Sequence, residues 1–183
     1  FGKVNPSGRL PESFPFSHMD CPAHCIGEFP GGKTVAYREG IFVGYRYYET
    51  RQMPVAFPFG YGLSYTEFTY ERLKARVKGN GNGAKVQVTL GVVNTGAMKG
   101  KEVVQLYVGR KNSGEDRPIR ELKAFDKISL KPGEIKNLEF MLDMEAFSYY
   151  DEKEKEFRVE KGAYIISVCR SAHEVWMETE VEL

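Results

Sequence analysis

The sequence has few cysteines, hardly any net charge and no long apolar run. Its three cysteines, Cys21, Cys25 and Cys169, are too few for a disulfide scaffold. Free thiols in a reducing compartment are therefore expected, and a cytoplasmic location is favoured over a secreted one. No apolar run approaches the roughly 20 residues that cross a bilayer, and a net charge of +1 attracts neither nucleic acid nor an anionic membrane. We expect no membrane partner, no nucleic-acid partner and no cofactor.

The start of the chain lacks two further features. Phe1 is not preceded by an initiator methionine, and the residues after it contain no apolar signal-peptide core. We therefore expect a fragment of a longer protein.

Proline is concentrated near the start, where seven of the nine prolines precede residue 60. Because proline removes a backbone donor and restricts the residue before it, residues 1–62 are not expected to hold long helices. One run, 40–48, is rich in aromatic and β-branched residues, and it predicts a strand. Nothing in 1–62 has a self-sufficient apolar pattern, which is typical of the edge of a larger domain whose remainder is missing.

After residue 63 the pattern alternates between apolar and polar residues. Such alternation places one side of each strand in a core and the other in water. Glycine- and proline-containing turns separate the runs, so 63–183 predict a sandwich of about seven strands in two sheets. One short turn is expected at 143–147 and an exposed hairpin tip at 151–156. The alternating positions lie in six runs: 86–92, 104–108, 128–130, 138–142, 164–168 and 175–181.

Four stretches carry a family resemblance, in a fixed order along the chain. They are the proline-rich motif 5–15, the run 39–49, the passage 57–68, and a set made of 94–96, 100–108, 117–118, 121–125 and 131–134. Together they resemble the C-terminal part of a glycoside hydrolase family three enzyme of the β-glucosidase kind. The resemblance implies that 1–62 are the C-terminal remnant of an α/β-sandwich domain with its linker. It implies an immunoglobulin-like, fibronectin type III-like β-sandwich at 63–183, so the fold is mainly β.

The same resemblance implies the chemistry of a complete enzyme. Retaining hydrolysis of β-linked glucosides needs two carboxyl groups about 5–5.5 Å apart. In the family these belong to a barrel domain and to the α/β domain upstream of residue 5, and neither matching motif occurs in this chain. We therefore predict no catalytic residue here. The fragment alone should be inactive, its partners are the other domains of the parent glycosidase, and a β-glucoside or oligosaccharide binds through the complete enzyme.

An alternative is an independent β-sandwich module that binds carbohydrate or a cell surface. It requires a planar row of exposed aromatic rings. The alternation leaves only scattered outward rings, such as Tyr107 and Trp176. The accessory role is therefore favoured.

Several residues are candidates for a site. Arg46, Tyr47 and Tyr48 could line a substrate cleft, although packing against a missing domain is the simpler interpretation. A carboxylate pair of Glu39 and Glu49 is excluded if the run between them is extended, because ten strand residues span about 33 Å.

Three residues are candidates for docking between domains: Arg117, Arg120 and Trp176. Trp176 is expected to be partly exposed, since it alternates with Val175 and Met177. A single ring makes a weak carbohydrate platform.

Two histidines and two cysteines cluster near the start of the chain: His18, Cys21, His24 and Cys25. Their side chains are of the kind that binds zinc. However, adjacent His24 and Cys25 strain a tetrahedral site, and no second cysteine pair follows. We predict no metal, and whether Cys21 and Cys25 are free or bridged stays open.

Overall fold

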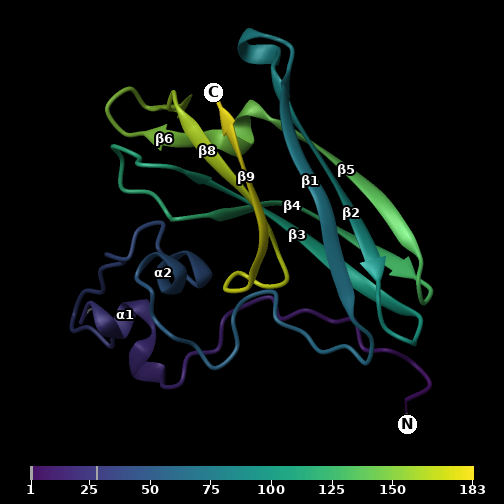
Figure 1. Ribbon diagram of the computed structural model, residues 1–183. Coiled ribbons are helices and arrows are strands. Elements are labelled where there is room, and N and C mark those ends of the chain that lie inside the picture. The colour runs from purple at the N-terminus through teal and green to yellow at the C-terminus, as the bar shows by residue number, and fades with distance from the viewer. Residues whose placement is uncertain (1, 28) are drawn as a thin grey trace.

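The computed structural model describes residues 2–27 and 29–183, and most of its regular structure is antiparallel sheet (Figure 1). One sheet has three strands in the order β1-β2-β5, and the other has four in the order β4-β3-β8-β9. The strands are β1 (Phe68–Lys78), β2 (Lys85–Asn94), β3 (Gly100–Arg110), β4 (Glu121–Leu130), β5 (Ile135–Asp143), β8 (Ala163–Cys169) and β9 (Val175–Glu182).

The two sheets enclose one apolar core, so the predicted two-sheet sandwich is confirmed. Alternate residues of the central strands point inward and exclude water, as the period of two requires. They include Val88 and Leu90 of β2, Leu106 of β3 and Ile166 of β8, each no more than 2% exposed.

Strand β1 was not predicted, because a β-bulge changes the side of its apolar residues. Phe68 and Tyr70 point into the core before the bulge, and Leu73 and Ala75 pack against it afterwards. The register shifts between Glu71 and Lys74. A bulge inserts an extra residue and so reverses the alternation. The strand therefore lacks a continuous period of two.

Short 3₁₀ turns lie between β1 and β2 (Gly81–Gly83) and after β5 (Met144–Phe147), and a small hairpin follows the second of these turns. It pairs β6 (Ser148–Asp151) with β7 (Glu156–Val159). The predicted short turn at 143–147 and the exposed charged tip at 151–156 are both confirmed.

The N-terminal segment, residues 2–62, has little regular structure, and its predicted strand at 40–48 is wrong. It contains a 3₁₀ turn (His18–Asp20), α1 (Pro22–Cys25) and α2 (Tyr45–Thr50). Gly40 and Gly44 both have φ near +56°, and Gly44 lies directly before α2. These glycines reverse the chain where a strand would continue. Burial of the α2 tyrosines then outweighs their preference for strands.

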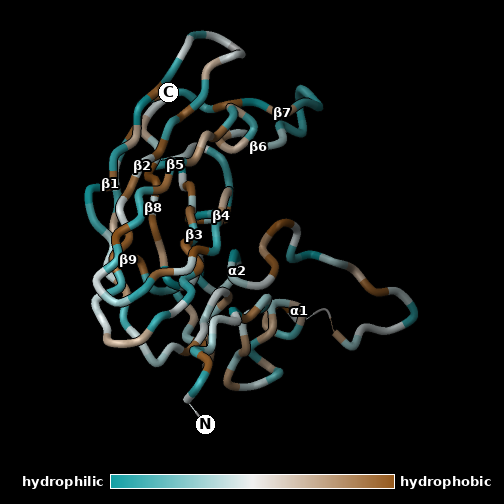
Figure 2. Tube along the Cα trace, turned by 90° about the vertical axis from the view of Figure 1, so that its right-hand side faces the viewer, coloured by the Kyte–Doolittle hydropathy of each residue, from teal (hydrophilic) through white to brown (hydrophobic). Residues whose placement is uncertain are grey.

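The N-terminal segment lies along one end of the sandwich (Figures 1 and 2). In Figure 2, the stretch between α1 and α2 extends away from the sheets. None of the helices in the described part of the chain is long and apolar enough to span a membrane.

Candidate functional site

A buried ion pair joins the N-terminal segment to the sandwich. Arg9 Nη2 lies 2.6 Å from Glu102 Oε2, with side chains 14% and 2% exposed. The other oxygen of Glu102 accepts a 2.6 Å hydrogen bond from the hydroxyl of Tyr70. Burial and the neighbouring carboxylate raise the pKa of Tyr70, so the hydroxyl remains a donor. A buried carboxylate needs such partners, and one of them comes from outside the sandwich.

The proline-rich motif is fixed on both sides of Arg9. Asn5 Oδ1 accepts a 2.6 Å hydrogen bond from the backbone N–H of Tyr65, and Asn5 Nδ2 donates to Ser64 Oγ at 3.1 Å. Lys127 Nζ of β4 donates to the backbone carbonyl of Ser7 at 2.8 Å. The proline-rich motif, one of the four stretches that carry the resemblance, is therefore one of the parts of the segment that dock on the sandwich.

A second contact covers the outer side of β3. Gln105 Nε2 donates to the carbonyl of Gly60 at 3.2 Å, and Tyr107 donates to Gln105 Oε1 at 2.8 Å. Tyr107 is 0% exposed and packs edge-on against Tyr45 of α2 at 5.8 Å. The prediction that Tyr107 is an outward, exposed ring is wrong. It does face away from the core, but the N-terminal segment covers it.

Helix α2 is joined to residues 119–122 at four successive points. The backbone N–H of Leu122 donates to Tyr45 Oη at 2.9 Å, and that of Ile119 donates to Thr50 Oγ1 at 3.0 Å. Between them lie two ion pairs, Arg46–Glu121 at 3.6 Å and Arg120–Glu49 at 3.5 Å. These contacts hold the helix against the loop that enters β4.

Glu49 is the central charge of this contact. Its side chain is only 7% exposed, and its other oxygen lies 3.4 Å from Nδ1 of His173. Burial raises the pKa of Glu49, while His173 and Arg120 oppose the shift. The desolvation of this carboxylate thus exceeds the attraction of its two partners.

The three cleft candidates have different positions. Tyr47 and Tyr48 are buried and form an apolar cluster with Phe42, Met53 and Val55. Arg46 is directed to Glu121, as described above. In this chain the tyrosines pack inside the N-terminal segment.

The docking candidates all make contacts within the chain. Arg117 donates to the carbonyl of Ser148 at 3.2 Å and lies over the ring of Tyr149. Trp176 is 39% exposed, as expected, but the guanidinium of Arg170 covers one face at 3.9 Å. Of the three candidates, Arg120 is the one that contacts the described part of the N-terminal segment, through its ion pair with Glu49.

The three cysteines are free thiols. Burial raises the pKa of Tyr48, which also interacts with Cys21. Within residues 2–27 and 29–183, no group of three or more His, Cys, Asp or Glu side chains is placed to hold a metal ion.

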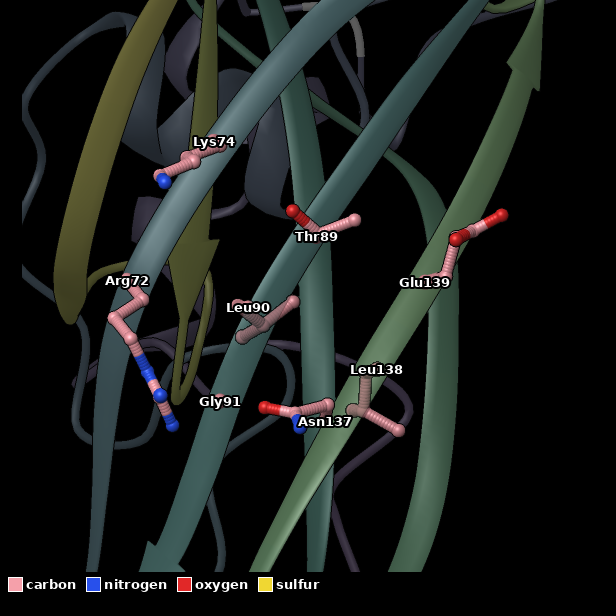
Figure 3. A pocket seen from close by; sticks show the side chains of 8 residues that line it. All are labelled: Arg72, Lys74, Thr89, Leu90, Gly91, Asn137, Leu138 and Glu139. Atoms are coloured by element: carbon pink, nitrogen blue, oxygen red, sulfur yellow. The ribbon is translucent and has the colours of Figure 1, made fainter.

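The hollows on the surface of the described residues include one on the sandwich and one in the N-terminal segment. One, of about 400 Å³, lies on the three-stranded sheet, where Gly91 has no side chain between Arg72 and Asn137 (Figure 3). Its lining is mixed in charge and includes Lys74 and Glu139. No aromatic ring lines it, so it lacks the stacking surface of a sugar platform.

The other hollow, of about 210 Å³, lies in the N-terminal segment. Its lining is mostly apolar and includes the rings of Phe29 and Tyr37, together with Glu39.

The comparisons with known proteins agree with this architecture. Residues 102–172 match the family model of the fibronectin type III-like domain. The chain therefore carries a domain of this class, and its two sheets are completed by β1 and β2 before residue 102 and by β9 after residue 172.

The particular relatives are β-glucosidases. Thermostable beta-glucosidase B of Acetivibrio thermocellus is 44% identical over 184 residues, which cover 100% of this chain and 24% of that protein. The crystal structure of the family-three β-glucosidase of Bifidobacterium adolescentis has a TM-score of 0.91 at 40% identity and covers 100% of this chain and 27% of that one. The crystal structure of the β-glucosidase of Kluyveromyces marxianus in complex with glucose has a TM-score of 0.91 at 41% sequence identity. The match covers 100% of this chain and 22% of that one.

The resemblance to a part of the glycoside hydrolase family three enzymes is thereby confirmed. The chain spans about a quarter of the length of the β-glucosidases that it matches.

Sequence reasoning missed the partners across the junction, although one signal was available. Glu102 is two residues before Val104 in the alternating run, so it occupies an inward-facing position. A carboxylate at such a position requires a buried partner. No spacing or motif in the sequence identifies Arg9 as this partner.

Proposed function

We propose that this chain is the accessory part of a β-glucosidase of glycoside hydrolase family three and braces catalytic domains located elsewhere in the parent protein. The observation that carries the proposal is the end-to-end match of the chain with only a quarter of several β-glucosidases. In this proposal, residues 1–62 are the remnant of the α/β domain with its linker, and 63–183 are the fibronectin type III-like domain. The complete enzyme hydrolyses terminal β-linked glucosyl residues with retention.

The junction supports a bracing role. Residues 2–62 bury little apolar surface of their own, and they are held to the sandwich by Arg9, Gly60 and α2. The sandwich therefore supplies the surface on which the end of the α/β domain is ordered. Both catalytic carboxyl groups lie outside the chain in this proposal, so the fragment alone is inactive.

A chimera tests the proposal. Thermostable beta-glucosidase B of Acetivibrio thermocellus is prepared in three forms: intact, truncated before the counterpart of residue 63, and with its matching quarter replaced by this chain. Hydrolysis of an aryl β-glucoside and the half-life on heating are measured. We expect the truncated form to lose stability and activity, the chimera to recover both, and this chain alone to be inactive.

Two results contradict the proposal. One is turnover of the glucoside by this chain alone. The other is full activity and thermal stability of the truncated enzyme.

The structure gives no specific support to an independent sugar-binding module. Tyr107 is buried, and Arg170 covers one face of Trp176. A pull-down of residues 1–183 on insoluble glucan provides the direct check, and we expect no retention.

A further inference from the structure

The hollow beside Glu39 has an unusual combination of charge and apolar lining. Glu39 Oε2 is buried and has no hydrogen-bond partner among the described residues. The cavity next to it, about 210 Å³, is lined by Ala23, Val35 and the aromatic residues Phe29 and Tyr37. A buried carboxylate oxygen without a partner is costly, so it requires a donor, and none of the side chains or backbone groups in residues 2–27 and 29–183 supplies one.

The chemistry of the lining favours a cation. A carboxylate binds a guanidinium through charge-assisted hydrogen bonds, and aromatic faces attract the same group. The volume is below the roughly 300–1,000 Å³ of pockets that enclose small-molecule ligands, which suits a single long side chain.

The exposed position of the hollow indicates that the long side chain comes from outside this chain. The stretch between α1 and α2 extends away from the sandwich, so the sheets do not cover it (Figure 2). Phe29 and Tyr37 are 55% and 83% exposed. About three quarters of the length of the matching β-glucosidases lies outside this chain.

We propose that the Glu39 pocket, lined by Ala23, Phe29, Pro30, Val35, Ala36, Tyr37 and Glu39, is a docking socket for an arginine side chain from the remaining part of the parent enzyme. This inference rests on the proposed function. The aliphatic stem of the arginine occupies the apolar lining, and its guanidinium pairs with Glu39 Oε2.

The first test compares the direction in which one substitution changes stability in the chain alone and in the chimera. Glu39→Gln removes the charge and retains the shape. In the chain alone, where Glu39 Oε2 has no partner among the described residues, we expect the unfolding midpoint to stay the same or rise. In the chimera with the Acetivibrio thermocellus enzyme, we expect the half-life on heating to fall about tenfold, because a charged hydrogen bond is lost. Glu12→Gln, at an exposed position of the same segment, should change neither.

The second test needs only this chain. Ethylguanidinium, a minimal arginine side chain, is titrated into the labelled chain at constant ionic strength, and amide NMR shifts are recorded. We expect shifts centred on the pocket that vanish in Glu39→Gln and persist in Glu12→Gln. Glucose is titrated in parallel and should cause none.

Two outcomes overturn the socket. One is an effect of Glu39→Gln with the same sign in the chain and the chimera. The other is glucose binding that depends on Glu39, which would make a sugar the occupant. Neither outcome affects the bracing proposal, which is judged from the unsubstituted chimera against the truncated enzyme.

Discussion

Replacement of Arg9 by methionine measures how strongly the junction is held. Methionine retains much of the apolar stem but leaves the Glu102 carboxylate, which is 2% exposed, with only the Tyr70 hydroxyl as partner. Loss of one member of a buried ion pair costs about 3–5 kcal/mol. At roughly 2–4 °C per kcal/mol for a chain of this size, the unfolding midpoint should fall by roughly 6–20 °C.

The chain offers a matched control. Lys85 and Asp143 form an ion pair of 2.8 Å with side chains 51% and 66% exposed. An exposed pair contributes about 0–1 kcal/mol, so Lys85→Met should have a small effect. Trp176, the only tryptophan, reports unfolding of the sandwich by its fluorescence in urea titrations of both variants.

A double variant separates the cost of the unpaired Glu102 carboxylate from the other effects of Arg9→Met. Arg9→Met with Glu102→Leu removes both members of the pair, so no carboxylate remains buried without its cation. We expect part of the lost stability to return. The reasoning is refuted if Arg9→Met costs no more than Lys85→Met.

Three further predictions follow from single sites. A Cβ at Gly60, where φ is +80°, would lie 2.2 Å from a carboxamide oxygen of β3, so Gly60→Ala should cost about 2–5 kcal/mol in urea unfolding. Gly133→Ala meets no atom within 4 Å at φ +73° and should cost only about 1–2 kcal/mol. Burial raises the pKa of Glu49 above 4.5, so the native state binds this proton more tightly than the unfolded chain. The stability of wild type relative to Glu49→Gln should therefore fall as pH rises above 4.5, as measured by urea titrations between about pH 4 and 7.5. An aromatic disulfide reagent should label exposed Cys25 in the native chain, and Cys169, whose pKa burial raises to about 12, only after unfolding.

Each of these has a contradicting result. Equal costs at the two glycines would mean that the close contact at Gly60 relaxes freely. A stability difference at residue 49 that is flat or rises with pH would mean that the ion pairs outweigh desolvation. Rapid labelling of Cys169 under native conditions would mean that the cluster around it opens readily.

The local sequence pattern was sufficient to predict a strand where apolar residues alternate regularly with polar ones. The runs in β2, β3 and β8 alternate without interruption, and they were predicted correctly. The pattern failed where the backbone changes direction within a run. In β1 a bulge reverses the alternation, and before α2 glycines with positive φ turn an apparent strand into a helix.

The candidate site was less predictable, because its residues are distant in the chain. Arg9 and Glu102 are separated by 93 positions, and Glu49 and Arg120 by 71. The alternation of β3 places Glu102 on the inward side of the strand, where a carboxylate needs a partner. Neither spacing nor composition identifies that partner. The same limit explains Tyr107. The alternation correctly predicted that its side chain faces away from the core, but it could not predict that the N-terminal segment covers the ring.

The sequence alone determined the class of fold and the order of the family's motifs, because these depend on local periodicity and on contiguous residues. The tertiary structure alone decided which charges are buried together and which rings are covered. Those outcomes depend on how the N-terminal segment packs across the end of the sandwich, and the energy of a buried charge is set by the atoms around it in space.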